Sequence, residues 1–363
     1  VIIKMREFTI VKHSRARLES AKKVSGEAVY TDDMTLQGMV FASVVRSPYA
    51  WAQVTGIDLS AAQKVPGYVG SLLPSEVPDK LYNCSGNPPS ALLMRDERIL
   101  TLEPKCAGDR ILCVAAETKR ACLEAAAAVA VKYEVKKPFF SIRQAVDGGE
   151  EPLQPHLSDS NILWTRQVKE GDAEEGFRES DFVLEDSFHV PPMQHTALEP
   201  TVCICDYKDG FMTIWSNSQT VFQERRILSE LTGLPETHIR IIKPTVGGGF
   251  GARQQLHSQP VAALLSMKLK RPVKIVNTRE EELYASVVRH EGEANIKIGA
   301  RKDGRIVSFY AKYFLNTGPY TTHGPTVLAA GARKFQYSIP NYFFDGYCVL
   351  SNTATAGAFR GYG

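Results

Sequence analysis

The pattern of apolar and polar positions predicts short strands and helices in alternation along the first third of the chain. Continuous apolar runs at 38–46 and 109–116 are typical of buried strands, and 131–135 is predicted as a further strand. Residues 118–130 are rich in Ala, contain no Gly or Pro and begin with a Thr that can cap a helix. A shorter helix is expected at 59–63. These elements predict one mixed α/β unit.

The rest of the chain predicts a second unit of the same class. Its expected strands are 182–188, 203–207, 211–216, 239–242, 295–298 and 305–313, and its expected helices are 219–231 and 261–269. Lys208-Asp209-Gly210 indicates a hairpin turn between two of these strands. The fold class is therefore α/β with mixed (α+β) sheets.

A polar stretch rich in Pro and Gly at 148–160 separates the two predicted units. The first residues are basic and irregular, which favours a solvated extension. We therefore expect an N-terminal arm at 1–19, a first domain at 20–145, a linker at 146–160 and a second domain at 161–363.

Composition excludes several classes of protein. The 363 residues include 43 Lys plus Arg and 40 Asp plus Glu, so the formal net charge is 43 − 40 = +3. That balance gives no electrostatic reason to expect a nucleic-acid or anionic-membrane partner. No apolar run is long enough to span a membrane and the start lacks a signal-peptide pattern, so a cytoplasmic protein is expected.

The cysteines do not suggest a metal site. There are seven, they are scattered, and no two form a Cys-x-x-Cys pair. An iron–sulfur cluster or zinc site built from this chain alone is therefore not expected.

The segment Val246-Gly247-Gly248-Gly249-Phe250-Gly251-Ala252-Arg253-Gln254, called here the glycine loop, is the sharpest local feature. Its glycines let a ligand approach bare backbone amides, and amides beside a helix N-terminus bind anions such as phosphate. The loop is expected to follow a strand and to precede a helix. It is not a P-loop, because no Gly-Lys-Ser/Thr follows.

Two other interpretations of the glycine loop stay open. It fits the loose Gly-x-Gly-x-x-Ala pattern of dinucleotide sites, but the acidic residue expected about 20 positions later is missing, since the next acid is Glu280. It could also be a tight turn that holds no ligand.

Several separate motifs together resemble the molybdenum-binding subunit of the xanthine dehydrogenase/aldehyde oxidase family. Besides the glycine loop they are Ser216-Asn217-Ser218-Gln219-Thr220, the C-terminal Ala354-Thr355-Ala356-Gly357-Ala358-Phe359-Arg360-Gly361-Tyr362-Gly363, Lys23-Val24-Ser25-Gly26-Glu27-Ala28-Val29-Tyr30-Thr31-Asp32-Asp33, Arg46-Ser47-Pro48-Tyr49-Ala50 and Gln194-His195-Thr196-Ala197-Leu198-Glu199-Pro200. The resemblance runs in order from about residue 20 to the end. It implies an α/β hammerhead domain followed by the first molybdopterin-binding domain.

The resemblance also implies roles for individual residues. Gln219 would hydrogen-bond the apical oxo ligand of molybdenum, and Arg360 would support the cofactor. Tyr362 would flank the substrate ring, and Gln254 stands where xanthine enzymes have a substrate-binding glutamate. The amides expected to face the metal and pterin are those of Gly248, Gly249, Phe250 and Gly251. No residue would ligate the metal directly, because the pterin cofactor holds it.

The activity implied by the resemblance is hydroxylation of a purine- or pyridine-like N-heterocycle with water as the oxygen donor. The implied cofactor is molybdenum-molybdopterin, expected in its cytosine dinucleotide form. Electrons would pass to iron–sulfur clusters and FAD on partner chains. The catalytic base, a glutamate, lies in the second half of the family's subunit, so we expect either a split subunit with a second molybdopterin-domain chain or a fragment. An aldehyde oxidoreductase of the same family and a non-catalytic or dinucleotide-binding subunit are the alternatives.

A structural role is an alternative to a functional one for three further groups of residues. His195 is expected to make structural hydrogen bonds rather than to pair with Glu199 on a metal. Glu280, Glu281 and Glu282 are expected to form a solvated helix start. His323 could line a substrate funnel or lie in a surface loop.

Overall fold

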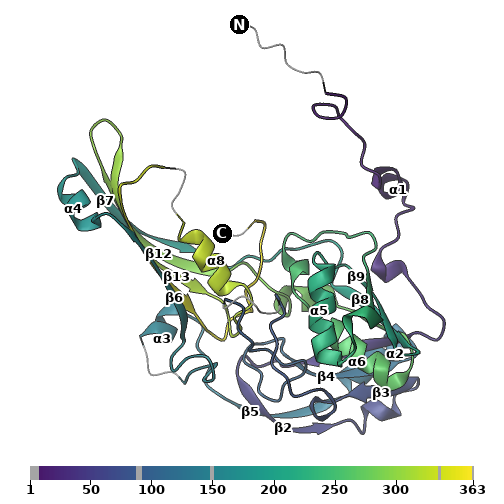
Figure 1. The fold of residues 1–363 in the computed structure, drawn as a ribbon. Coiled ribbons are helices and arrows are strands. Elements are labelled where there is room, and N and C mark those ends of the chain that lie inside the picture. The colour runs from purple at the N-terminus through teal and green to yellow at the C-terminus, as the bar shows by residue number, and fades with distance from the viewer. Residues whose placement is uncertain (1–7, 87–91, 148–150, 334–336, 362–363) are drawn as a thin grey trace.

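A computed structural model places residues 8–86, 92–147, 151–333 and 337–361, and the description below is confined to these residues. Two mixed β-sheets and a separate two-stranded ribbon carry the fold (Figure 1). The predicted α/β class with mixed sheets is confirmed.

A seven-stranded sheet combines strands from both halves of the chain. Its order is β10 (Ile239–Ile242), β9 (Phe211–Ser216), β8 (Val202–Lys208), β11 (Val273–Val276), β1 (Val40–Arg46), β4 (Arg110–Ala116) and β3 (Tyr68–Leu72). The two halves meet where β1 pairs in parallel with β11, with Val40 opposite Val273. Strands from before and after the predicted linker share this sheet, so the division into domains stays a proposal from the sequence.

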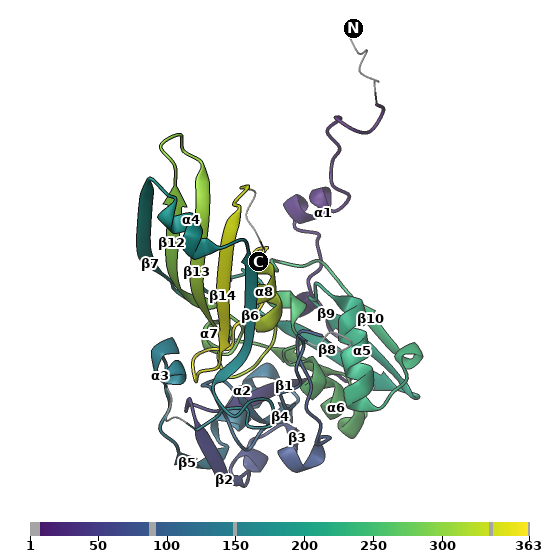
Figure 2. The same cartoon turned by 60° about the vertical axis from the view of Figure 1, so that its left-hand side comes forward.

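The second sheet has five strands and stands beside the first (Figure 2). Its order is β6 (Ile162–Glu170), β14 (Asn341–Val349), β13 (Ile306–Asn316), β12 (Glu291–Ala300) and β7 (Phe182–Val190). The two-stranded ribbon consists of β2 (Ala52–Asp58) and β5 (Ala130–Val135).

Helices cover both faces of the seven-stranded sheet. Cys113 and Ala115 of β4 join the apolar core shared with α5 and α6, whereas Leu112 and Val114 face the cluster that includes Ala125 of α2. This alternation follows from the period of two along a strand. The α-helices are α1 (Ser20–Ser25), α2 (Lys119–Ala127), α3 (Ile142–Val146), α4 (Ala173–Arg178), α5 (Val221–Thr232), α6 (Gln259–Leu269), α7 (Arg279–Tyr284) and α8 (Gly324–Gly331).

Local sequence signals account for several of the element boundaries. The Thr118 hydroxyl accepts a hydrogen bond from the Ala121 amide and caps α2 as expected. In the predicted hairpin, Asp209 and Gly210 have φ of 51° and 85°, which is the left-handed pair that a tight two-residue turn requires. The helix expected from 219 begins at Val221, which leaves Gln219 outside it.

The described part of the N-terminal arm extends away from the body of the molecule (Figures 1 and 2). Its side chains at 8–19 are exposed. Among the residues placed here, no helix has the length and apolar character needed to cross a membrane.

Candidate active site

The glycine loop follows β10 and contacts three segments that are distant in sequence. A Cβ added at Gly247 would lie 2.5 Å from Cβ of Glu199, and one at Gly249 would lie 2.7 Å from Oε1 of Gln219. At Gly251 an added Cβ would collide with the carbonyl of Ala358. The close approach of these backbones explains why the loop contains so many glycines.

The loop follows β10 and precedes α6, as expected, but it does not lie at the N-terminus of α6. It does not open an α-helix, because Ala252–Gln254 forms only a three-residue 3-10 turn and α6 begins at Gln259. An α-helix N-terminus therefore does not supply the anion-binding donors. Any donors come from the loop amides themselves.

Three consecutive amides of the loop are available to a ligand. Gly247 N–H donates to Oε2 of Glu199 over 2.6 Å, and Gly251 N–H donates to Oε1 of Gln219 over 3.0 Å. Among the described residues, none accepts a hydrogen bond from the N–H groups of Gly248, Gly249 or Phe250, called here the amide cradle. Because backbone donors are rarely left unpaired, the amide cradle is suited to hold hydrogen-bond acceptors of a ligand.

Gln219 is fixed through both its side chain and its backbone. Its side-chain oxygen accepts from the N–H groups of Gly251 and, over 3.3 Å, Arg253, while its backbone N–H donates to the Arg253 carbonyl over 2.8 Å. The side chain is otherwise exposed. Since the carbonyl end is occupied, the NH₂ end is the part of Gln219 left to donate to a ligand.

Two other predicted site residues lie against the same loop. Arg360 donates its backbone N–H to the Phe250 carbonyl over 2.8 Å, and its guanidinium is 5.0 Å from the centre of the Phe250 ring. Gln254 closes the turn through a 2.9 Å bond from its N–H to the Gly251 carbonyl, and its own carbonyl accepts from the Thr220 hydroxyl. Tyr362 lies outside the described residues.

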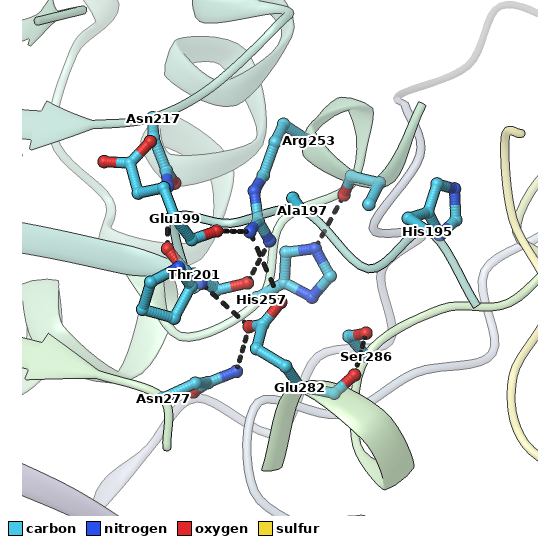
Figure 3. Close-up of polar contacts among 12 residues, drawn as sticks. His195, Ala197, Glu199, Thr201, Asn217, Arg253, His257, Asn277, Glu282 and Ser286 are labelled. Carbon is cyan, nitrogen blue, oxygen red and sulfur yellow. Dashed lines mark hydrogen bonds and ion pairs between the residues drawn. The ribbon is translucent and has the colours of Figure 1, made fainter. Parts of the chain in front are cut away.

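A buried polar network supports the loop from behind (Figure 3). The Arg253 guanidinium, whose side chain is 1% exposed, contacts the Glu282 carboxylate over 3.3 Å and the Glu199 carbonyl over 2.8 Å. It also donates to the Thr201 hydroxyl. Neither motif nor spacing in the sequence had indicated a role for Arg253.

The expected solvation of the 280–282 acids is wrong for Glu282. This residue is 6% exposed, whereas Glu280 is exposed and Glu281 is partly buried in an ion pair with Arg46. Thr278 caps α7 through a capping box with Glu281, and that start turns Glu282 inward. Burial alone would raise the pKa of Glu282, but Arg253 and the donors from Thr201 outweigh it and lower the pKa.

His195 and His323, for which the sequence left a functional role open, are both buried. His195 lies between two carbonyl oxygens, 3.1 Å from that of Val287 and 2.7 Å from that of Ala358, which agrees with the expected structural role. His323 is 8% exposed, so it is not a surface-loop residue, and burial lowers its pKa to about 4. Its Nδ1 lies 2.9 Å from the side-chain amide of Gln255.

Two family models match nearly the whole chain. Residues 154–363 match the model described as "Molybdopterin cofactor-binding domain". Residues 25–137 match "Aldehyde oxidase and xanthine dehydrogenase, a/b hammerhead domain". The chain belongs to the xanthine dehydrogenase/aldehyde oxidase family of molybdenum-dependent oxidoreductases.

Curated relatives within this family include a probable xanthine dehydrogenase subunit of Bacillus subtilis, 34% identical over 98% of the chain and 47% of the relative. "Nicotinate dehydrogenase large molybdopterin subunit" of Eubacterium barkeri is 31% identical over 99% of the chain and 83% of the relative. The chain thus spans about half the length of the first relative and most of the second.

A solved structure of the same family has the same fold. The aldehyde oxidoreductase of Desulfovibrio gigas superposes with a TM-score of 0.89 at 26% identity, over 96% of this chain and 39% of that one. The site residues fit a molybdopterin cofactor in one respect that the structure itself provides. The loop offers three neutral N–H donors and the Gln219 amide, which suit the oxygen and sulfur acceptors that such a cofactor presents.

Proposed function

We propose that this chain forms the molybdenum side of a hydroxylase that oxidises a purine- or pyridine-like N-heterocycle, with water as the oxygen donor. The observation that carries the proposal is the amide cradle beside the NH₂ end of Gln219. When bound, molybdenum-molybdopterin would supply the two-electron oxidation and oxygen-transfer chemistry.

The chain's own residues would bind the cofactor and orient the substrate. The NH₂ group of Gln219, fixed by Gly251 and Arg253, would donate to an oxo group without adding charge. The amide cradle would bind the pterin part of the cofactor. Arg360 would support the cofactor from its position against the loop, where its N–H donates to the Phe250 carbonyl. Gln254 would contact the substrate, and Tyr362 would flank its ring.

The choice of an N-heterocycle rests on the relatives. The Eubacterium subunit, which this chain covers over most of its length, is named for nicotinate, and the Bacillus relative is named for xanthine. We further propose that the cofactor is the cytosine dinucleotide form. The partners would be an iron–sulfur chain, a FAD chain and a chain with the second molybdopterin domain.

An aldehyde oxidoreductase is the second candidate. The likeness to the Desulfovibrio enzyme favours it, and the neutral Gln254 does not demand a purine. The two candidates differ in substrate, not in the chemistry of the loop.

The experiment is a substrate panel with the natively isolated complex in water enriched in ¹⁸O. Nicotinate, hypoxanthine and benzaldehyde are offered with an artificial electron acceptor, and products are identified by mass spectrometry. The proposal expects a hydroxylated heterocycle that carries ¹⁸O. Exclusive conversion of benzaldehyde to the acid would favour the second candidate, and no oxidation of any of the three by a molybdenum-loaded complex would contradict both.

A further inference from the structure

Arg253 and Glu282 form a buried ion pair with further hydrogen bonds on both sides. The carboxylate of Glu282 accepts from the Thr201 N–H over 2.8 Å and from the Asn277 side chain over 3.0 Å. The two side chains are 1% and 8% exposed. Each polar contact therefore fixes the guanidinium in place in surroundings where water cannot substitute for it.

The same Arg253 controls the environment of Gln219 through its main chain. The Arg253 N–H donates to the side-chain oxygen of Gln219 over 3.3 Å. The Arg253 carbonyl accepts from the backbone N–H of Gln219 over 2.8 Å. The anchored side chain and the bonded peptide belong to one residue. A shift of the guanidinium would thus move the two groups that decide which way the Gln219 amide points.

The opposite end of the loop is tied to the same network. The Glu199 carbonyl accepts a hydrogen bond from the Arg253 guanidinium, and the Glu199 carboxylate accepts one from the Gly247 N–H. Glu199 and Arg253 thus hold the two ends of the stretch that carries the amide cradle. Figure 3 shows these side chains converging from separate segments.

We propose that Arg253 and Glu282 are positioning residues, whose ion pair sets the shape of the glycine loop and the orientation of the Gln219 amide toward the cofactor. The inference rests on the proposed function. The two side chains bond to Glu199, Thr201, Asn277 and each other, not to the amide cradle. Their effect should therefore appear in the electronic surroundings of the metal and in kcat rather than in substrate binding.

The test compares three variants of the holoenzyme. Glu282→Gln keeps the shape of the side chain but removes its charge. Arg253→Lys keeps the charge but cannot span Glu199, Thr201 and Glu282 together. Glu281→Gln is the matched control, because Glu281 is the neighbouring residue on α7 and pairs with Arg46 over 3.0 Å rather than with Arg253. Gln at this position can still accept the Thr278 N–H, so the capping box of α7 is kept.

The readouts are molybdenum content, the electron paramagnetic resonance signal of reduced molybdenum, kcat, KM and Tm. We expect Glu282→Gln and Arg253→Lys to retain molybdenum, shift the resonance signal and lower kcat about 10- to 100-fold with little change in KM, as for other residues behind a metal site. Glu281→Gln should lower Tm but leave the signal and kcat unchanged.

Two outcomes would overturn the proposal. One is a signal and kcat in Glu282→Gln and Arg253→Lys that match those of Glu281→Gln. The other is failure of both variants to fold while Glu281→Gln folds, which would assign the pair to stability alone. Absence of molybdenum from the wild-type complex would instead contradict the proposed function first.

Discussion

The backbone N–H of Arg360 donates to the carbonyl of Phe250 over 2.8 Å, although 110 residues separate them in the sequence, and the Arg360 guanidinium lies 5.0 Å from the Phe250 ring centre. Both residues have positive φ, 43° for Arg360 and 50° for Phe250. Two strained backbones that support each other are typical of a site that holds a ligand. The contact ties the C-terminal motif to the glycine loop.

Replacing Gly251 by Ala should damage the loop more than its positive φ alone explains. Gly251 has φ of 108°, and an added Cβ would collide with Ala358. Gly304→Ala is the matched control, since Gly304 has φ of 86° and an added Cβ there would meet no described atom within 4 Å. We expect Gly304→Ala to lower the free energy of unfolding by about 1 kcal/mol and Gly251→Ala by more, with loss of bound molybdenum only in the latter. Urea denaturation and elemental analysis would measure this, and equal effects would refute the close-contact explanation.

Gln219→Glu should separate the donor role of Gln219 from its structural role. The carboxylate can still accept from Gly251 and Arg253, but the NH₂ donor is gone. Loss of one such donor lowers kcat by about 100- to 1000-fold in other enzymes. Gln63→Glu, on an exposed side chain, should change neither kcat nor Tm. Steady-state kinetics with full activity in Gln219→Glu would contradict the assigned role.

Gln254→Glu should shift substrate preference toward purines. A carboxylate makes charge-assisted hydrogen bonds to ring N–H groups, which are about 1–1.5 kcal/mol stronger than neutral ones and correspond to about a tenfold gain. The measurement is the ratio of kcat/KM for hypoxanthine to that for nicotinate. A ratio that is unchanged would show that residue 254 does not contact the substrate.

Glu224 predicts a pH dependence of stability. This residue of α5 is 1% exposed, and burial raises its pKa from 4.5 to about 7, although Ser218 and Ser216 partly oppose the shift. A raised acid pKa has no effect below pH 4.5, destabilises progressively between pH 4.5 and 7, and has its full effect above pH 7. That effect is about 3 kcal/mol. Glu224→Gln should therefore stabilise the protein at pH 8 but not at pH 4.5, as measured by urea denaturation, and a stabilisation equal at both pH values would disprove this.

The sequence predicted nine of the strands that the structure describes and missed five, which are β2, β3, β6, β11 and β14. In β14, Asp345 and Gly346 break the apolar pattern, and Asp345 is satisfied by Gln167 and Tyr347 only in the folded sheet. The four residues of β11 pair with β8 on one side and, on the other, with β1 more than 200 positions away. Such long-range partners leave no local signal.

The candidate site divides in the same way. Gln219, Gln254, Arg360 and the glycine loop were predicted from motifs and the family resemblance, and the structure places them in contact with one another, while their roles stay predictions. Glu282 was missed because charged residues after a helix cap ordinarily face water. Arg253 was missed because its partners, Glu199, Thr201 and Glu282, are distant in the sequence. The residue spacing of the capping box could have indicated that Glu282 faces inward.

The most direct test of the account is the molybdenum content of the chain isolated natively with its partners. Elemental analysis should find about one molybdenum per chain, with iron on copurifying subunits, and Gly251→Ala should lose the molybdenum while keeping the iron. A wild-type complex that contains iron-bearing partners but no molybdenum, or a chain that binds NAD or FAD at the glycine loop instead, would contradict the central claim.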